Sequence, residues 1–418
     1  MRPVFGVLLL AAVTLLTAGA ACRHAPGQGG VVWPAQPVAA ALETGGMSMG
    51  PQLTSSARGT ILSWLDIQET TAVLRYSERG STGTWSAPRT ITQGTDWFVS
   101  EVDMPAVLRL RNGSLAAQWL KAVDLALEAY DVRLAFSRDD GQSWSQPVAP
   151  HHDGTTAQHG FVSLFEWPDA AGGGLGLVWL DGRKMAAEGV DPPSDEMSLF
   201  RARFDVGGKQ IEETAVDGRV CECCPTSVAI ASRGPVVAFR DRSPKDVRDI
   251  YVARATGSTW DAPVAVHADN WTIDACPVNG PAVAASGDTV AVAWFSQPGE
   301  DGHAFVAFSQ DGGRTFGAPA RVDEAASLGH VGIALLDDGA AVVTWVEFDQ
   351  GASFRARRVD RSGTRGAPLR IAGEKGHFVS GIPRVMRQGD TLVFAWTESA
   401  GEGGSQRVKV ATAPLPRP

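Results

Sequence analysis

Short apolar runs that end in an aromatic residue recur along almost the whole chain, and each has the length of one β-strand. Seven of these runs follow one another at similar intervals, and they end at Trp64, Trp119, Trp179, Phe239, Trp294, Trp345 and Trp396. Neighbouring members are 51 to 60 residues apart. This step is longer than one hairpin and suits four strands with their turns. The pattern therefore predicts seven copies of one antiparallel sheet.

The other strands of each unit can be placed around the aromatic one. An apolar strand precedes it, as at 106–110, and a third strand follows it, as at 132–136. The fourth begins with Ala-Pro or Gln-Pro, as at 262–266, because an outermost strand tolerates the missing N–H of proline. The last unit stops after its third strand at 407–411, whereas 33–38 has the pattern of a fourth strand. We expect the N-terminal segment to complete the last sheet and close the ring.

Two eight-residue segments, 137–144 and 309–316, share the spacing Ser-x-Asp-x-Gly-x-x-aromatic. Ser and Asp side chains can accept hydrogen bonds from the backbone of a tight turn, and Gly permits a positive φ there. The aromatic residue can then fold back as an apolar plug. This spacing resembles the Asp box of the sialidase-like β-propellers, where the loop joins the outer two strands of a blade and lies away from the known active sites.

The repeat and the resemblance together predict an all-β chain with a single large domain. We expect a seven-bladed β-propeller over residues 31–413, with four-stranded antiparallel blades and a ring closed by the N-terminal strand. A six-bladed propeller of the sialidase type is the alternative. Residues 23–30 are expected to form a flexible linker, and 414–418 a short tail.

The first 22 residues have the features of a targeting segment. Their apolar run at 5–16 is too short to anchor the chain across a bilayer. The segment resembles a bacterial lipoprotein signal with Cys22 as the lipidated first residue, although Gly19 stands where such signals usually carry Leu. We therefore expect a periplasmic or cell-envelope lipoprotein, tied to a membrane only through the lipid on Cys22, with ordinary secretion as the alternative.

Charge and length change the list of partners. A formal net charge of −9 argues against a nucleic-acid surface. The 418 residues, with 47 Gly and 25 Pro, suit many short strands and turns around a large core. We expect a small ligand, a metal ion or a glycan on the central face. A scaffold that contacts only other envelope proteins is a further alternative.

Soft metal ligands recur near the predicted start of the innermost strand of every unit. Counting back 15 residues from the aromatic reaches Met or Cys or His in four units, and 18 to 20 residues reaches His or Cys in the other three. Equivalent positions of a propeller converge on its axis, and these ligand types favour copper, or zinc where Cys and His dominate. The candidate metal ligands are Met49, Met104, His159, Cys221, Cys223, Cys224, Cys276, His330 and His377.

The cysteines also support a simpler interpretation. The mature chain has four of them, and an even number in an oxidising compartment favours two disulfides. One bridge would join Cys223 or Cys224 to Cys276 and brace adjacent blades. The two methionines would then be packing residues, each histidine a structural residue, and the central site a disulfide-braced pocket for a small ligand.

A second set of charged residues follows the aromatic strands. Carboxylates and guanidinium groups around a cleft can bind a sugar or an anion, and a pair of carboxyl groups can cleave a glycosidic bond. The alternative function is therefore an exo-acting glycoside hydrolase of sialidase type, and its candidate catalytic residues are Asp181, Arg183, Asp241, Arg242 and Glu347. Ordinary ion pairs of solvated loops are the competing explanation.

The sialidase resemblance implies three arginines that hold a substrate carboxylate and a late Tyr–Glu nucleophile pair. Arg183, Arg242 and Arg384 are the candidates for the arginines. However, the chain lacks an Arg-Ile-Pro signature near its N-terminus, and none of its three tyrosines comes after Tyr251. Our leading hypothesis is therefore a binding protein with a central Met, His and Cys site, and the hydrolase is the alternative.

Overall fold

The computed structural model describes residues 32–124, 128–168, 173–185, 196–256, 259–348, 351–374, 377–400 and 404–417. The expected targeting segment with Cys22 and the expected linker lie outside these ranges. Within them, no helix has the length and apolar character that crossing a bilayer requires.

The described strands fall into seven sheets. The first contains β2 (Met47–Ser56), β3 (Gly59–Gln68), β4 (Thr71–Arg79) and β5 (Arg89–Gly94). The second contains β6 (Ala106–Arg109), β7 (Leu115–Asp124) and β8 (Ala129–Ser137), and a bridge between Leu134 and Val148 marks its fourth position. The third contains β9 (His159–Trp167), β10 (Gly174–Asp181), β11 (Met197–Phe204) and β12 (Gln210–Val220).

The fourth sheet contains β13 (Ser227–Ala231), β14 (Gly234–Arg240), β15 (Ile250–Thr256), β16 (Thr259–Trp260) and β17 (Val264–Ala265). The fifth contains β18 (Ala282–Ser286), β19 (Thr289–Ser296), β20 (His303–Ser309) and β21 (Ala320–Arg321). The sixth contains β22 (Ser327–Leu335), β23 (Ala341–Phe348), β24 (Ala352–Val359) and β25 (Leu369–Ala372). The seventh contains β26 (His377–Gln388), β27 (Thr391–Ala400), β28 (Gln406–Pro414) and β1 (Val38–Ala39).

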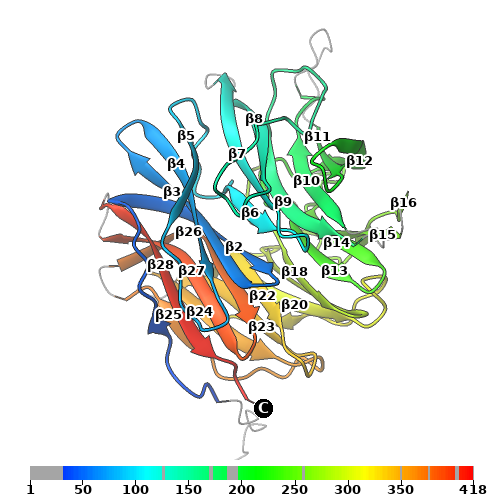
Figure 1. Ribbon diagram of the computed structural model, residues 1–418. Coiled ribbons are helices and arrows are strands. Elements are labelled where there is room, and N and C mark those ends of the chain that lie inside the picture. Colours follow the sequence, from blue (N-terminus) through cyan, green and yellow to red (C-terminus); the bar gives the residue numbers. More distant parts are fainter. Residues whose placement is uncertain are drawn as a thin grey trace, which may run out of the picture.

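These sheets are the blades of a seven-bladed β-propeller, as the repeat predicted (Figure 1). The innermost strands β2, β6, β9, β13, β18, β22 and β26 contact one another in this order, and β26 returns to β2. Strand β1 pairs with β28, so the N-terminal segment supplies the outermost strand of the last blade. The expected ring closure is therefore confirmed, and the six-bladed alternative is wrong.

The core of the protein lies between blades rather than inside one central nucleus. Each cluster of buried residues joins two neighbouring sheets, and one of these clusters joins the last blade to the first. All seven predicted aromatic residues lie in the second strand of a blade, and Trp64, Trp179, Trp294 and Trp345 are almost fully buried. Burial of such large rings supplies much of the hydrophobic stabilisation.

The two Ser-x-Asp loops have the turn structure that their spacing predicted. In the first, Asp139 Oδ1 accepts hydrogen bonds from the Ser143 backbone N–H and from the Ser137 hydroxyl, each at 2.9 Å. In the second, Asp311 Oδ1 accepts one from the Thr315 N–H at 2.9 Å. The aromatic ring of Trp144 packs edge-on against Tyr76 of the first blade. Both loops follow the third strand of a blade, β8 and β20 respectively.

A disulfide between Cys223 and Cys276 connects the segment before β13 with the segment before β18. It therefore braces the fourth blade against the fifth, which is one of the pairings expected from the sequence. The bridge closes a loop of 53 residues. We expect the double variant Cys223→Ser/Cys276→Ser to lose about 2–4 kcal/mol of unfolding free energy, because its unfolded chain gains conformational freedom. Urea denaturation checks this, and an unchanged midpoint would contradict it.

Candidate functional site

One position of each innermost strand faces the propeller axis. It is the residue paired with the one just before the second-strand aromatic, as for Gln52 with Ser63 and Arg384 with Ala395. The seven axial positions are Gln52, Ala106, Ser163, Ser227, Ala282, Gly332 and Arg384. Six of them are uncharged, so Arg384 supplies the single formal charge of this ring.

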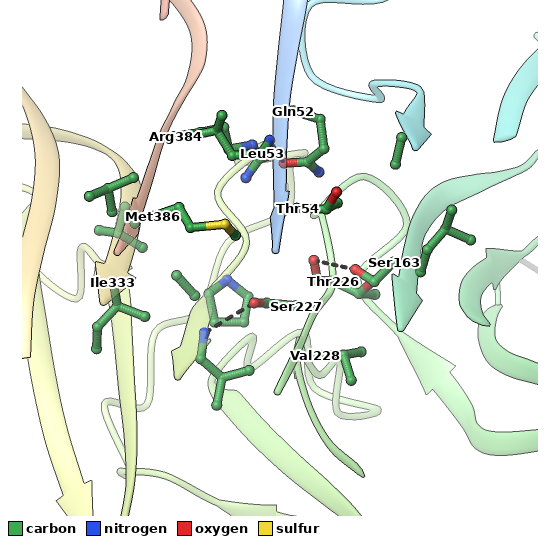
Figure 2. A pocket seen from close by; sticks show the side chains of 18 residues that line it. Gln52, Leu53, Thr54, Ser163, Thr226, Ser227, Val228, Ile333, Arg384 and Met386 are labelled. Carbon is green, nitrogen blue, oxygen red and sulfur yellow. Dashed lines mark hydrogen bonds between the residues drawn. The ribbon is translucent and has the colours of Figure 1, made fainter. Parts of the chain in front are cut away.

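The axial positions line a pocket with a volume of about 190 Å³. Residues of all seven blades contribute to its wall. Figure 2 shows Gln52 and Arg384 extending into it from neighbouring inner strands, together with the thioether of Met386. Pockets for drug-sized ligands usually have about 300–1,000 Å³. The axial pocket is therefore suited to a small ligand or to the terminal group of a larger one.

The hydroxyl groups of the pocket wall also hold neighbouring blades together. The Ser163 hydroxyl donates to the backbone carbonyl of Thr226 at 2.9 Å, and the Thr226 hydroxyl donates to the carbonyl of Phe161 at 3.0 Å (Figure 2). The Ser227 hydroxyl accepts a hydrogen bond from the Val283 N–H at 3.1 Å. These contacts fix the shape of the pocket before any ligand arrives, which lowers the entropic cost of binding.

Arg384 differs from the rest of the wall because its guanidinium group has no protein partner among the described residues. Its Nε atom is sealed from solvent and makes no hydrogen bond. Burial, which disfavours the charged form, lowers the pKa of Arg384 to about 10. The group is therefore still a cation at neutral pH. An arginine fork without a carboxylate is ready to accept a planar anion through two hydrogen bonds.

Other arginines of the protein interior have such partners. Arg109 pairs with Glu78 at 2.9 Å, Arg201 pairs with Glu212 at 2.6 Å, and Arg248 pairs with Glu222 at 2.8 Å. Burying a charge without compensation is costly, so proteins normally pair it. The exception at Arg384 lies where a ligand can enter, which makes this residue the strongest candidate for a binding group.

His330 is the neighbour of Arg384 on the sixth blade. Burial, together with the positive charge of Arg384, lowers the pKa of His330 to about 4. The imidazole is therefore neutral at pH 7 and leaves the charge of the pocket to Arg384. Its Nδ1 atom is buried and makes no hydrogen bond within the described part of the chain.

The structure corrects the expectation that the soft ligands meet at one point on the axis. The residues that line the axial pocket include none of the nine candidates. Met49 lies in the core cluster between the first two blades, where Gly50 brings the backbone next to Met104. His377 is half-exposed and lies 3.5 Å from Glu398. The others are distributed over three further places: His159 beside His151, His330 beside Arg384, and Cys221, Cys223, Cys224 and Cys276 beside the fourth blade.

The physical reason is a bulge near the start of several innermost strands. The pairing register shifts between Met49 and Gln52, between Gly329 and Gly332, and between Ser380 and Arg384. A positive φ occurs at the same place, for example at His330 with φ 51°. A bulge reverses which face the following side chains point to. Residues before it therefore enter blade interfaces, and residues after it reach the axis.

His159 belongs to a buried group of charged residues between the second and third blades. Its ring stacks on His151 with centroids 3.8 Å apart and an angle of 2° between the planes. His159 Nε2 lies 3.2 Å from Asp153 Oδ2, and its Nδ1 lies 3.8 Å from Asp131 Oδ1. Two parallel rings do not direct their nitrogen lone pairs at one point. One ion bound by both rings would therefore require one of them to turn.

A buried carboxyl group beside this cluster gives a pH-dependent prediction. Asp103 accepts a hydrogen bond from the Phe161 N–H at 2.8 Å, and burial raises its pKa to about 7. The folded state thus binds a proton that the unfolded state releases near pH 4. Stability from this group is present below that pH and declines as the pH rises towards 7. We expect Asp103→Asn to flatten the pH dependence of the unfolding free energy between pH 4 and 7, measured by urea denaturation.

The exposed substitution Asp301→Asn is the control for this measurement, because it removes a carboxyl group without changing a buried one. It should leave the slope of the wild type intact. Equal slopes for the wild type and Asp103→Asn would show that Asp103 ionises normally in the folded protein.

The proposed catalytic carboxylates Asp181 and Glu347 have structural partners. Asp181 accepts hydrogen bonds from Trp179 Nε1 at 2.8 Å and from Arg183 Nε at 2.7 Å. Glu347 accepts one from Trp345 Nε1 at 3.1 Å and one from the Glu324 N–H at 3.0 Å. Asp66 repeats the arrangement with Trp64 at 2.8 Å. Such carboxylates tie the aromatic strand to its surroundings, and both Asp181 and Glu347 are at most 1% exposed.

Asp241 and Arg242 lie apart from these ties, at the end of β14. Burial and the nearby carboxylate of Asp217 raise the pKa of Asp241 to about 7. Arg242 donates to Asp246 Oδ1 at 2.8 Å. The five catalytic candidates thus belong to three blades, and the residues lining the axial pocket include none of them.

Comparisons with known proteins support the fold. No family model matches the sequence, and no curated protein matches it either. Among solved structures, a lectin from Burkholderia pseudomallei has a TM-score of 0.58 at 12% identity, covering 86% of this chain and 95% of the lectin. An α-L-arabinofuranosidase from Fusarium graminearum has a TM-score of 0.50 at 15% identity, covering 77% and 95%. A Hadza microbial sialidase has a TM-score of 0.48 at 16% identity, covering 83% and 74%. The first two likenesses support the β-propeller fold, and at such identities they concern the fold alone.

Proposed function

We propose that this protein is an exported binding propeller that holds a carboxylate-bearing sugar in its axial pocket. The observation that carries the proposal is the unpaired guanidinium of Arg384 at the axis. A sugar carboxylate would give it the bidentate partner that the protein does not supply. The amide group of Gln52, on the neighbouring inner strand, is placed to share the ligand.

The size and chemistry of the pocket support a sugar acid over a larger ligand. The volume of about 190 Å³ admits a small molecule or one terminal sugar residue. Hydroxyl and amide groups from Gln52, Thr54, Ser163, Thr226 and Ser227 provide the kind of polar wall that orients a ligand. The likeness to a lectin and to a glycosidase adds support for a glycan over another anion.

Binding is favoured over hydrolysis in this proposal because the pocket wall contains no carboxylate. Glycoside hydrolysis requires an acid and a second carboxylate on either side of the scissile bond. The residues that line the pocket carry Arg384 as their single ionisable group. The hydrolase alternative would therefore need carboxylates that lie elsewhere.

Isothermal titration calorimetry with a panel of monosaccharides tests the proposal. We expect glucuronate, galacturonate or N-acetylneuraminate to bind, and glucose and galactose to bind at least about tenfold more weakly, because they lack the carboxylate. Added salt should weaken the binding of the acids. Equal affinity for acidic and neutral sugars, or no binding of any acid, would overturn the proposal. Release of a fluorogenic leaving group from acidic glycosides would replace binding with hydrolysis.

A further inference from the structure

Two buried thiols lie side by side in the segment between β12 and β13. The Sγ atoms of Cys221 and Cys224 are 3.1 Å apart, within hydrogen-bonding distance, and the residues are 0% and 1% exposed. Cys223 lies between them in the sequence but is bonded to Cys276. The segment thus contains a dithiol next to a separate disulfide, although three cysteines fall within four residues.

Positive charge surrounds one of the two thiols. Arg248 Nη1 lies 3.3 Å from the sulfur of Cys221 and 2.8 Å from Glu222 Oε2. The guanidinium of Arg240 is buried and donates to three neutral backbone carbonyls, those of Asn279, Arg248 and Phe295. A guanidinium whose partners carry no formal charge stabilises a nearby anion strongly, because the interior screens it weakly.

The two thiols therefore differ in acidity. Burial opposes ionisation of Cys221, but the hydrogen bond with Cys224 and the charge of Arg240 outweigh it and lower the pKa of Cys221 to about 6. Burial raises the pKa of Cys224, so this residue stays a thiol and serves as the donor. A thiolate beside a thiol is the arrangement of a nucleophilic cysteine with a resolving partner.

We propose that Cys221 and Cys224 are a redox-active pair that closes into a second disulfide by exchange with a small-molecule or protein disulfide. The Cys221 thiolate attacks one sulfur of the external disulfide, which forms a mixed disulfide and releases one thiolate. Cys224 then loses its proton and displaces the second thiolate from Cys221. One external disulfide is reduced to two thiols, and the protein dithiol is oxidised to one disulfide.

The geometry makes this closure a small movement. The sulfur atoms must approach from 3.1 Å to about 2.05 Å, the length of a disulfide bond. The attack itself requires the segment to open, because neither sulfur is exposed. The inference does not depend on the proposed sugar ligand, since it concerns a different part of the fourth blade.

Redox titration of the full-length protein tests the inference. The protein is equilibrated overnight in buffers of reduced and oxidised glutathione, quenched with acid, alkylated and analysed by peptide mass spectrometry. We expect Cys221 and Cys224 to change together from alkylated to protected over a range in which the Cys223–Cys276 bridge stays closed. Two thiols that stay alkylated in fully oxidising buffer would overturn the proposal, and so would oxidation only through exchange with Cys223 or Cys276.

A pair of matched variants separates the roles of the two sulfurs. Cys224→Ser removes the resolving thiol, so it should accumulate a mixed disulfide of glutathione on Cys221. Cys221→Ser should accumulate several-fold less on Cys224, because that thiol ionises poorly. Equal trapping in both variants would contradict the assigned roles. A stoichiometric copper or zinc ion in the wild type that both thiols are needed to hold would also overturn the redox assignment. The wild-type titration decides the proposal even if a variant does not fold.

Discussion

Replacing Arg384 with methionine is expected to abolish recognition of acidic sugars and to stabilise the free protein at the same time. The guanidinium has no partner among the described residues and its Nε is sealed from solvent, so the unliganded fold bears the cost of an unpaired charge. Methionine has a similar length and no charge. We expect sugar-acid binding to weaken by about 2 kcal/mol or more, roughly 30-fold in Kd, and unfolding free energy to rise by about 1–2 kcal/mol.

Arg387→Met is the matched control on the same strand. Arg387 points away from the pocket and pairs with Asp337 at 2.6 Å. Its replacement should leave sugar binding unchanged and lower stability slightly, because surface pairs contribute little. Calorimetric titration and urea denaturation give both readouts. If Arg384→Met bound the acids as the wild type does, or lost stability, the guanidinium would be a structural group and the binding site would lie elsewhere.

Removal of the Glu347 carboxylate is expected to be the most destabilising single change at the blade interfaces. The variant Glu347→Ala leaves Trp345 Nε1 and the Glu324 N–H without their acceptor and leaves Arg355 without its ion pair at 3.1 Å. These groups are buried or half-buried, so each pays a desolvation penalty. We expect a loss of about 3–5 kcal/mol in unfolding free energy.

Glu300→Ala removes the same side chain from an exposed loop of the fifth blade. Its unfolding free energy should stay within about 0.5 kcal/mol of the wild type, as for most surface changes. A loss below about 1 kcal/mol in Glu347→Ala would contradict the structural role. Glu347 would then be free for chemistry, as the hydrolase alternative requires.

The architecture was predictable because the same strand pattern occurs in every blade. Seven apolar runs ending in an aromatic residue gave the number of blades, and all seven aromatic residues occupy second strands. The incomplete last unit and the strand-like segment near Trp33 gave the closure of the ring through β1 and β28. These features depend on burial of repeated apolar faces, which the sequence shows directly.

The axial site was missed by a few residues in the count along each inner strand. Counting back 15 positions from the aromatic selects residues such as Met49 and His330, whereas 12 or 13 positions selects Gln52 and Gly332. The bulge between the two positions decides which of them reaches the axis, and no residue type marks it: Gly50 and His330 both adopt the positive φ. The strand period alone therefore points at the wrong face.

Arg384 was named only as a candidate member of a sialidase arginine triad. The sequence does not show that it lacks a partner, because this depends on what the six other blades bring to the axis. Their axial positions turn out to be small or neutral, for example Ala106, Ala282 and Gly332. The pairing of Asp181 with Arg183 and of Glu347 with Arg355 is equally invisible in the sequence until the strands are in register.

A crystal structure of the protein soaked with glucuronate tests the central claim most directly. We predict that the sugar carboxylate lies in the axial pocket within hydrogen-bonding distance of both terminal nitrogens of Arg384. A sugar bound on the outer surface of a blade, with the axial pocket left to water, would contradict this account.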